Sequence, residues 1–485
     1  MTISRQREPN IRATVVAVLI ASFLLPFAVT GPAIVLPALT ADLDASASGT
    51  QWVQNAYNAV FAATVLAMGS LADRFGRRRV LRAGIATFAV AMALIAISSN
   101  IVLIDVLRGI QGLAAGATVS AGSAVLAHAT SGHQRVRVFG LLGASFGGGT
   151  AMGPLIAGLL APLGWRYVFV AIALAAAVAF FVSRYVRESR DPATARPDLA
   201  GMALFGGALF LLSLGFVNSG DAGWLDPWTL GYFAATLLLL ALFIVLELRI
   251  DHPMFQIRLF KRPAFIAMMC MPFSVTFGLA ALNVYLPIFL QSDGASPLAA
   301  AVELTPLEVP VLLVPLAARW LTGRWSERFL LITSPILIAA GSFGLVLMDR
   351  GASPWVSLMP LLVLGIGVGV AFAIMDNAAI STVPVAQAGA AAGMFNTMRI
   401  TGESLAVAAT AAVLISVTSA RTSAAEATAA IQGQHIGPMT GAAFADALYI
   451  VVIGLGVLAL VGALLTAWAL RNTKPNQTKT PGATS

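Results

Sequence analysis

Long apolar runs of about 20 residues, separated by short polar breaks, follow one another through almost the whole chain. A helix of this length crosses a bilayer, because each residue adds about 1.5 Å and the hydrocarbon core is about 30 Å thick. The runs lie near residues 13–39, 51–72, 80–98, 101–127, 138–160, 165–185, 199–218, 227–248, 264–290, 299–318, 329–348, 355–380, 393–418 and 443–470. The pattern predicts an all-α membrane protein with about fourteen transmembrane helices.

The composition agrees with this class. Hydrophobic residues make up 58% of the chain and charged residues 10%, and the mean hydropathy is +0.87, whereas a soluble domain carries about 25% charged residues. The single cysteine, Cys270, excludes an intramolecular disulfide, and four scattered histidines give no metal-binding cluster. We therefore expect no metal and no cofactor. The pI near 10.2 comes from basic residues spread over many short loops, which indicates membrane topology and no nucleic-acid partner.

Basic residues are unevenly distributed over the polar breaks. With a cytoplasmic amino terminus, most of the 29 Lys and Arg residues fall in or beside cytoplasmic segments, and Arg166, Arg350 and Arg421 fall outside. This is the charge asymmetry that orients membrane proteins. The first apolar run is also too long for the core of a signal peptide, so it predicts an uncleaved anchor. We expect a multi-pass protein of the plasma (inner) membrane with both termini cytoplasmic.

The runs divide into two sets of six with an additional pair between them. We expect a cytoplasmic segment at 1–12, a six-helix bundle at 13–186, a linker with two additional transmembrane helices at 187–262, a second six-helix bundle at 263–470 and a disordered cytoplasmic tail at 471–485. Segment 319–328, R-W-L-T-G-R-W-S-E-R, occupies in the second set the place that segment 69–81 has in the first, which indicates a degenerate internal repeat. Repeated bundles of this kind enclose a site near the membrane midplane and open alternately to either side. We expect the protein to be a monomer.

A burst of charge stands between the second and third runs, in segment 69–81, G-S-L-A-D-R-F-G-R-R-R-V-L. Its charged side chains require a short loop on the cytoplasmic side, and its glycines permit a tight turn. An ordinary basic loop explains the arginines but not the Gly, Asp and Gly at fixed offsets. The segment resembles the G-x-L-A-D-R-x-G-R-R signature of the major facilitator superfamily. The resemblance implies a role in the conformational cycle for Gly69, Asp73, Arg74, Gly76, Arg77 and Arg78.

For Asp73 we expect a more specific role. Its carboxylate should accept hydrogen bonds from a helix amino terminus or an arginine in the outward-facing state, as a latch between the bundle halves.

The fourth run contains an arginine, in the sequence Arg108-Gly109-Ile110-Gln111-Gly112. This element resembles the R-x-x-Q-G element of the superfamily, in which the arginine is linked to proton transfer. An arginine within a span costs at least about 2.5 kcal/mol, so it should face a partner or a wet cavity. A second interpretation stays open, in which Asp105 neutralises Arg108 from one turn away and the pair serves packing alone.

The fifth run carries small residues in segment 149–158, G-T-A-M-G-P-L-I-A-G. The segment resembles the antiporter motif G-x-x-x-G-P-x-x-G-G of the superfamily and departs from it at Ala157. Small residues at this spacing allow two helices to approach closely, and a proline bends the helix. A hinge at the bundle interface and plain tight packing are the two interpretations for Gly149, Gly153, Pro154 and Gly158.

The resemblance extends over nearly the whole chain. Segment 393–405, G-M-F-N-T-M-R-I-T-G-E-S-L, resembles the thirteenth helix of the fourteen-helix drug:proton antiporter family, which includes multidrug and antibiotic exporters. Gln51-Trp52 with Tyr57 resembles the opening of that family's second helix. The family has an aspartate in the first helix, and this chain has Ala28 at that position. The location of proton coupling is therefore open.

Several ionisable residues lie within the predicted spans and are candidates for proton coupling, because an unpaired carboxylate is expensive in hydrocarbon. The candidates are Asp105, Arg108, Glu303, Glu308, Asp376, Arg399 and Glu403. Arg399 and Glu403 are one turn apart and are expected to neutralise each other. Asp376 lies near the end of its run and is open to a role as a helix-end contact.

A second set of polar residues within the runs is a candidate for the substrate cavity, since such sites combine apolar walls with a few polar groups. The set comprises Asn55, Asn58, Gln111, Asn283, Tyr285 and Asn377. Contacts between helices are the alternative role for these side chains.

Together these features predict a secondary transporter of the major facilitator type that exports an amphipathic small molecule against inward proton flow. Proton-independent movement of a lipid or hydrophobic metabolite is the first alternative, and a non-transporting membrane sensor or scaffold is the second. An enzyme is not expected, because the sequence shows no nucleotide-binding loop or nucleophile constellation.

Overall fold

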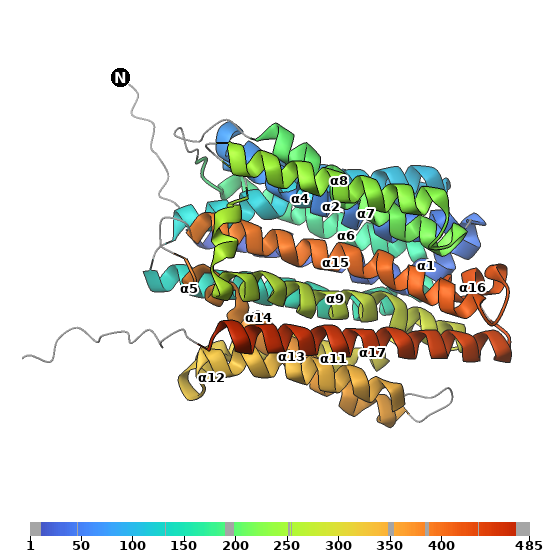
Figure 1. Ribbon diagram of the computed structural model, residues 1–485. Coiled ribbons are helices and arrows are strands. Elements are labelled where there is room, and N and C mark those ends of the chain that lie inside the picture. The colour runs from blue at the N-terminus through green and yellow to red at the C-terminus, as the bar shows by residue number, and fades with distance from the viewer. Residues whose placement is uncertain are drawn as a thin grey trace, which may run out of the picture.

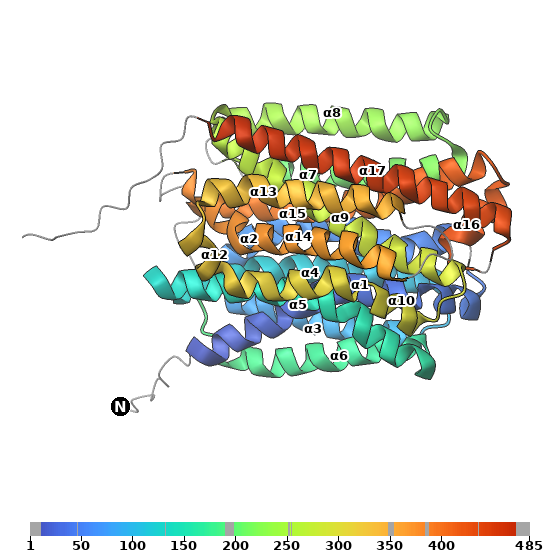
Figure 2. The same cartoon turned by 90° about the horizontal axis from the view of Figure 1, so that it is seen from below.

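The computed structural model of the 485-residue chain describes residues 11–45, 47–130, 132–189, 198–250, 253, 255–347, 354–383, 388–434 and 436–471. Long helices lie side by side along one direction, and the described residues contain no strand (Figures 1 and 2). The first half contains α1 (Ile11–Leu43), α2 (Ala47–Phe75), α3 (Arg77–Ile97), α4 (Ile101–Ala129), α5 (Gly132–Leu160) and α6 (Trp165–Val182). Two helices follow, α7 (Leu199–Ala222) and α8 (Pro227–Arg249).

The second half is less regular. It contains α9 (Pro263–Ser292), α10 (Pro297–Glu303), α11 (Thr305–Leu313), α12 (Ala318–Arg324), α13 (Glu327–Gly344), α14 (Pro354–Ser381), α15 (Ala388–Ser419), α16 (Ala424–Ile431) and α17 (Pro438–Ala469). Short 3-10 turns at Ala161–Leu163, Ser183–Tyr185, Ile257–Lys261, Val314–Ala317 and Leu345–Leu347 complete the described elements.

Twelve helices of the described residues are long and apolar enough to cross a membrane. A thirteenth span is formed by Pro297–Glu303 and Thr305–Arg324, which meet at a bend of 52°. Helix α2, with 29 residues, is not among the twelve and carries the buried amides Gln51, Gln54, Asn55 and Asn58. Counted with α2, the spans correspond to the fourteen predicted runs. The all-helical membrane fold is confirmed.

The two halves repeat one packing scheme. In the first half α1 packs on α5 and α6, α2 on α4, and α3 on α4 and α6. The second half shows the same scheme, with α9 on α15 and α17, α11 on α14, and α13 on α14 and α17. The halves meet where α2 packs on α15, α5 on α10 and α11, and α1 on α9. This scheme agrees with two six-helix bundles, although the predicted boundaries stay a prediction, and 1–10 and 472–485 lie outside the described residues.

The additional pair covers one seam between the halves. Helix α7 packs on α8, α2 and α15, while α8 lies at the edge of the molecule (Figure 2). At one end of this seam the Trp224 indole N–H donates to the Ser416 hydroxyl at 3.0 Å. Helices α7 and α8 therefore bridge the two halves on one side. They do not cover the other seam, where α5 packs on α11.

The connections between the long helices gather at two ends of the molecule (Figures 1 and 2). We call the end with the α2–α3 turn, the Ile257–Lys261 turn and α12 the basic face, because it holds most of the described arginines. We call the end with α16 the opposite face. Figure 1 shows α12 and α16 at the two ends.

Candidate functional site

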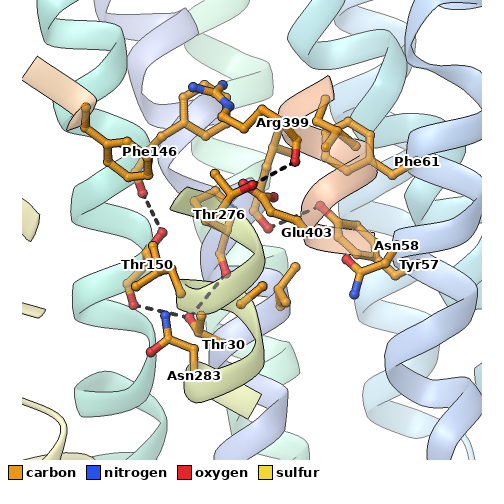
Figure 3. Close-up of a pocket in the computed structure, with 17 residues that line it drawn as sticks. Thr30, Tyr57, Asn58, Phe61, Phe146, Thr150, Thr276, Asn283, Arg399 and Glu403 are labelled. Atoms are coloured by element: carbon orange, nitrogen blue, oxygen red, sulfur yellow. Dashed lines mark hydrogen bonds between the residues drawn. The ribbon is translucent and has the colours of Figure 1, made fainter. Parts of the chain in front are cut away.

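A central cavity lies between the two halves, about midway along the helices. Its walls come from α1, α2 and α5 of the first half and from α9, α14 and α15 of the second. Figure 3 shows its most informative lining residues, which are Thr30, Tyr57, Asn58, Phe61, Phe146, Thr150, Thr276, Asn283, Arg399 and Glu403. The cavity offers about 50 Å³ to the centres of water-sized molecules, whereas drug-sized sites measure roughly 300–1,000 Å³. The halves must separate before such a ligand enters.

A second cavity lies between the first one and the basic face. It offers about 40 Å³ and is lined by α4, α5, α14 and α15. Arg399 and Phe146 belong to the walls of both cavities, and Asp376 lines only the second. Arg399 and Phe146 therefore form a partition between the two spaces.

The partition consists of the Arg399 guanidinium stacked on the Phe146 ring. The Arg399 guanidinium lies 4.7 Å from the centroid of the Phe146 ring, on the other half of the molecule. One of its nitrogens is 4.0 Å from the Asp376 carboxylate, which is the only ion-pair partner of Arg399 among the described residues. The ion pair of Arg399 is thus with Asp376 across helices, while Glu403, one turn away, interacts with Arg399 through its charge without an ion pair within 4.0 Å among the described residues. Glu403 faces the central cavity.

Arg108 is the second cation of this region and is completely buried, with 0% of its surface exposed. Its guanidinium donates to the backbone carbonyls of Val53 at 2.5 Å and Ala28 at 2.9 Å, and to the side-chain oxygens of Gln111 at 2.7 Å and Gln54 at 3.4 Å. All four acceptors are neutral. A buried charge is tolerated when its donors are satisfied in this way.

The carboxylate nearest to Arg108 in sequence does not pair with it. Asp105 makes no ion pair with Arg108 within the described ranges, and one Asp105 oxygen is buried without a hydrogen-bond partner there. The position at which related sequences are expected to carry an aspartate, Ala28, lies directly against the guanidinium. The first half therefore holds a buried positive charge with no acid paired to it among these residues.

Tyr57 connects Arg108 to the central cavity. The guanidinium lies 4.7 Å from the centroid of the Tyr57 ring, and the ring also lines the cavity. The Tyr57 hydroxyl donates to the Leu25 carbonyl at 3.1 Å, which fixes the ring against α1. One aromatic ring thus separates the Arg108 charge from the ligand space.

The small residues of α5 face two different neighbours. A methyl group added at Gly149 would overlap the Phe23 carbonyl oxygen, and one added at Gly153 would overlap the Thr30 hydroxyl. Both contacts are with α1 of the same half. Gly158, by contrast, faces α10 of the other half, where an added Cβ would lie 3.0 Å from the Ala301 Cβ. The predicted motif therefore combines packing within one half with one contact between halves.

The α2–α3 turn is held by the segment that follows α6. Gly76 has φ +111°, a conformation that favours glycine, and a Cβ there would lie 2.7 Å from a Glu188 carboxylate oxygen. Glu188 accepts from the Arg78 backbone N–H at 3.1 Å. Asp73 pairs with Arg77 at 2.7 Å. These contacts stay within the first half, so a latch from Asp73 to the other half remains a prediction.

The other predicted polar residues are divided between the cavity and structural contacts. Asn58 and Asn283 line the cavity, and Gln111 belongs to the Arg108 shell. The Tyr285 hydroxyl donates to the Val407 carbonyl at 2.8 Å, which is a helix–helix contact.

The remaining candidates lie away from the cavity lining. Asn377 is exposed and reaches Glu327 at 3.4 Å, Asn55 is buried outside the lining, and Glu303 lies at the end of α10. Glu308 is buried, and among the described residues the Asn283 amide is the group that faces its carboxyl.

Sequence reasoning missed several lining residues. Thr150, Thr276 and Phe372 carry no pattern that separates them from other helix-packing residues, because their place in the wall depends on tertiary structure. Glu188 was also missed. It is an acid just after the sixth run, and its charge alone could have indicated a partner for the basic segment 69–81.

The opposite face is closed by contacts between the halves. The Gln291 amide on α9 donates to the Ile34 carbonyl of α1 at 3.1 Å. After α16, the Gln432 amide reaches the Thr50 hydroxyl of α2 at 3.5 Å. The described conformation is therefore joined at the opposite face, with the second cavity on the side of the basic face.

Comparison with known proteins agrees with this architecture. The model of the Major Facilitator Superfamily matches residues 18–407. The chain is 30% identical over 405 residues to the tetracenomycin C resistance and export protein of Streptomyces glaucescens, which covers 81% of this chain and 74% of that protein. It is 29% identical over 484 residues to the puromycin resistance protein of Streptomyces alboniger, covering 97% and 93% of the two chains.

Solved structures show the same fold. A bacterial homologue of the human lysosomal transporter Spinster, in an inward-facing and unoccupied conformation, superimposes with a TM-score of 0.65 at 15% identity and covers 96% of this chain and 98% of its own. The resemblance drawn from the sequence motifs is thus confirmed by the family match, the relatives and the fold. The chain belongs to the major facilitator superfamily.

Proposed function

We propose that this protein exports amphipathic small molecules from the cytoplasm in exchange for protons. The observation that carries the proposal is an acid, Glu403, on the wall of a cavity that both halves enclose, one turn from an arginine that reaches a second acid. An intramembrane acid in such a place is a candidate for proton transport by default. The names of the relatives, which describe resistance and export proteins, agree with an exported drug or antibiotic as the cargo.

The geometry supports a simple exchange cycle. A carboxylic acid releases its proton when a guanidinium approaches, and it holds the proton when the guanidinium withdraws. Glu403 lines the central cavity, Asp376 lines the second cavity, and Arg399 belongs to the walls of both. The Arg399 guanidinium is also stacked on Phe146 of the other half. Separation of the halves removes this stacking partner, so rocking changes which acid Arg399 meets. We propose that Glu403 carries the proton and that Arg399 controls its release.

The direction of transport follows from the proposed orientation. With the basic face in the cytoplasm, as the charge distribution favours, the second cavity lies on the cytoplasmic side and the contacts at Gln291 and Gln432 close the outer side. A substrate would then enter from the cytoplasm. Both termini would be cytoplasmic and the protein would lie in the plasma membrane.

Inverted membrane vesicles test the proposal. A fluorescent amphiphile should accumulate in vesicles with an acidic lumen, and accumulation should stop when the pH gradient is collapsed. Vesicles from cells that lack the protein serve as the control. Accumulation that is unchanged without the gradient contradicts proton exchange, and no difference from the control vesicles contradicts transport.

A further inference from the structure

Resting on the proposed export function, we infer that the central cavity takes uncharged or acidic aromatic amphiphiles and excludes permanent cations. Lipophilic cations are held in proteins by the faces of aromatic rings and by acids. The central cavity has four aromatic side chains in its lining, Tyr57, Phe61, Phe146 and Phe372. Whether the faces of these rings are already occupied by protein cations therefore decides whether they can bind a cationic substrate.

Two of the four rings already carry a cation. The Arg108 guanidinium lies 4.7 Å from the Tyr57 ring, and the Arg399 guanidinium lies 4.7 Å from the Phe146 ring. These rings come from α2 and α5, so the occupied faces are on two walls of the first half. A cationic ligand stacked on either ring would be brought close to a fixed positive charge. An electron-rich aromatic ligand stacked there would be attracted by the same charge.

The acid of the lining and the acid paired with Arg399 do not reverse this bias. Glu403 is the only acid among the described lining residues, and the Asp376 carboxylate is 4.0 Å from Arg399. The two acids and the two arginines, Arg108 and Arg399, cancel when Glu403 is ionised. They leave a positive charge when Glu403 holds a proton. In neither state of Glu403 does this group of four present a net negative charge to a ligand.

One unpaired amide indicates what the ligand offers. Asn58 and Asn283 line the cavity and are 4% and 1% exposed. The Asn58 amide nitrogen has no hydrogen-bond partner among the described residues, whereas Asn283 lies beside the buried Glu308 carboxyl. Buried polar groups are normally paired. An amide N–H₂ donates to carbonyl, phenolate or carboxylate oxygens. The cavity thus combines a free amide donor, Asn58, with cation-backed aromatic walls, which fits an oxygen-rich aromatic molecule that is neutral or acidic.

A charge series on one aromatic skeleton tests the inference. The full-length protein in inverted vesicles is given fluorescein as the anion, an uncharged xanthone, or rhodamine 123 as the cation, each with an acidic lumen and with the membrane potential clamped by potassium and valinomycin. We expect the anion and the neutral compound to accumulate at least tenfold faster than the cation. A cation that accumulates as fast as the anion overturns the inference and leaves the export function standing. Accumulation of none of the three dyes counts against both.

A variant links the preference to the arginine. In Arg399→Gln the ratio of anion affinity to cation affinity should fall at least threefold, measured by dye anisotropy on the purified protein so that a loss of driven transport does not hide the effect. The matched control is Arg421→Gln, which removes an arginine paired with Asp446 near the opposite face. An unchanged ratio in Arg399→Gln, or an equal fall in Arg421→Gln, contradicts the assignment.

Discussion

Substitutions at Gly153 and Thr30, which contact each other, test how α5 is packed against α1. The Thr30 hydroxyl donates to the Pro26 carbonyl at 3.2 Å or to the Thr150 carbonyl at 3.4 Å, the latter across the two helices. In Gly153→Ala the new methyl group would overlap this hydroxyl. The Thr30 side chain must then rotate and give up its position between the two carbonyls.

The expected cost follows from these contacts. Overpacking a tight site costs about 1–3 kcal/mol, and a hydrogen bond within a membrane protein contributes on average about 0.6 kcal/mol. We expect Gly153→Ala to lower the free energy of unfolding by about 2–4 kcal/mol. Thr30→Ala alone should cost about 1 kcal/mol. The double variant should recover at least about 1 kcal/mol of the sum, because the overlapping hydroxyl is gone.

The assay is unfolding of the purified protein by SDS, followed by loss of helical circular dichroism. Gly149→Ala is the matched control, since its methyl group would overlap the backbone carbonyl of Phe23, which no side-chain truncation removes. Thr30→Ala should therefore rescue Gly153→Ala and leave Gly149→Ala unrescued. Parental stability of Gly153→Ala, or equal rescue of both glycine variants, would refute the packing geometry.

Three further outcomes are expected. Glu403→Gln should abolish gradient-driven accumulation but keep exchange of labelled substrate between equal pools, and driven accumulation at the parental rate would remove Glu403 from proton transport. Gly76→Ala should lower thermal stability, since φ +111° strains a residue with a Cβ by about 1–2 kcal/mol. Adding Glu188→Ala should relieve only the 2.7 Å overlap between the new Cβ and the Glu188 carboxylate, so full rescue would show that backbone strain is absent. Gly433→Val should separate the halves at the opposite face, because its Cβ would lie 2.5 Å from Pro37 and its φ is +69°; unchanged spin-label distances between α1 and α16 would contradict this.

Helix positions were largely predictable because hydrophobic runs report directly on burial in lipid. The run at 227–248 corresponds to α8, Pro227–Arg249, which begins after the capping Asp226. The run at 299–318 was predicted as one helix, whereas the structure divides it between α10, α11 and the 3-10 turn Val314–Ala317. Three prolines, at 306, 310 and 315, remove backbone donors there, so the division has a visible cause.

A short helix outside the spans was missed although its signal was present. Helix α16 begins after Ser423, whose hydroxyl accepts from the Glu426 N–H at 3.2 Å, while the Glu426 carboxylate accepts from the Ser423 N–H. Serine followed three residues later by glutamate is the sequence form of this capping box. A search for 20-residue apolar runs does not detect an eight-residue helix.

The arrangement of the site was less predictable than the helices. Motifs identified Arg108 and Arg399, but their partners lie far away in sequence, with Ala28 and Val53 around one and Asp376 and Phe146 around the other. The i,i+4 rule favoured Glu403 as the partner of Arg399 within α15, and it did not indicate the additional ion pair with Asp376 on α14. Periodicity places a side chain on a helix face but does not tell which neighbour that face meets.

The coupling of protons to export is the central claim, and the lumenal pH tests it most directly. Inverted vesicles with an acidic lumen and a trapped pH dye are mixed with an exported compound, and the lumenal pH is followed with the membrane potential clamped. The proposed exchange predicts that the compound makes the lumen less acidic with the parental protein and does not do so with Glu403→Gln. Accumulation of the compound by the parental protein with no change in lumenal pH would contradict proton exchange.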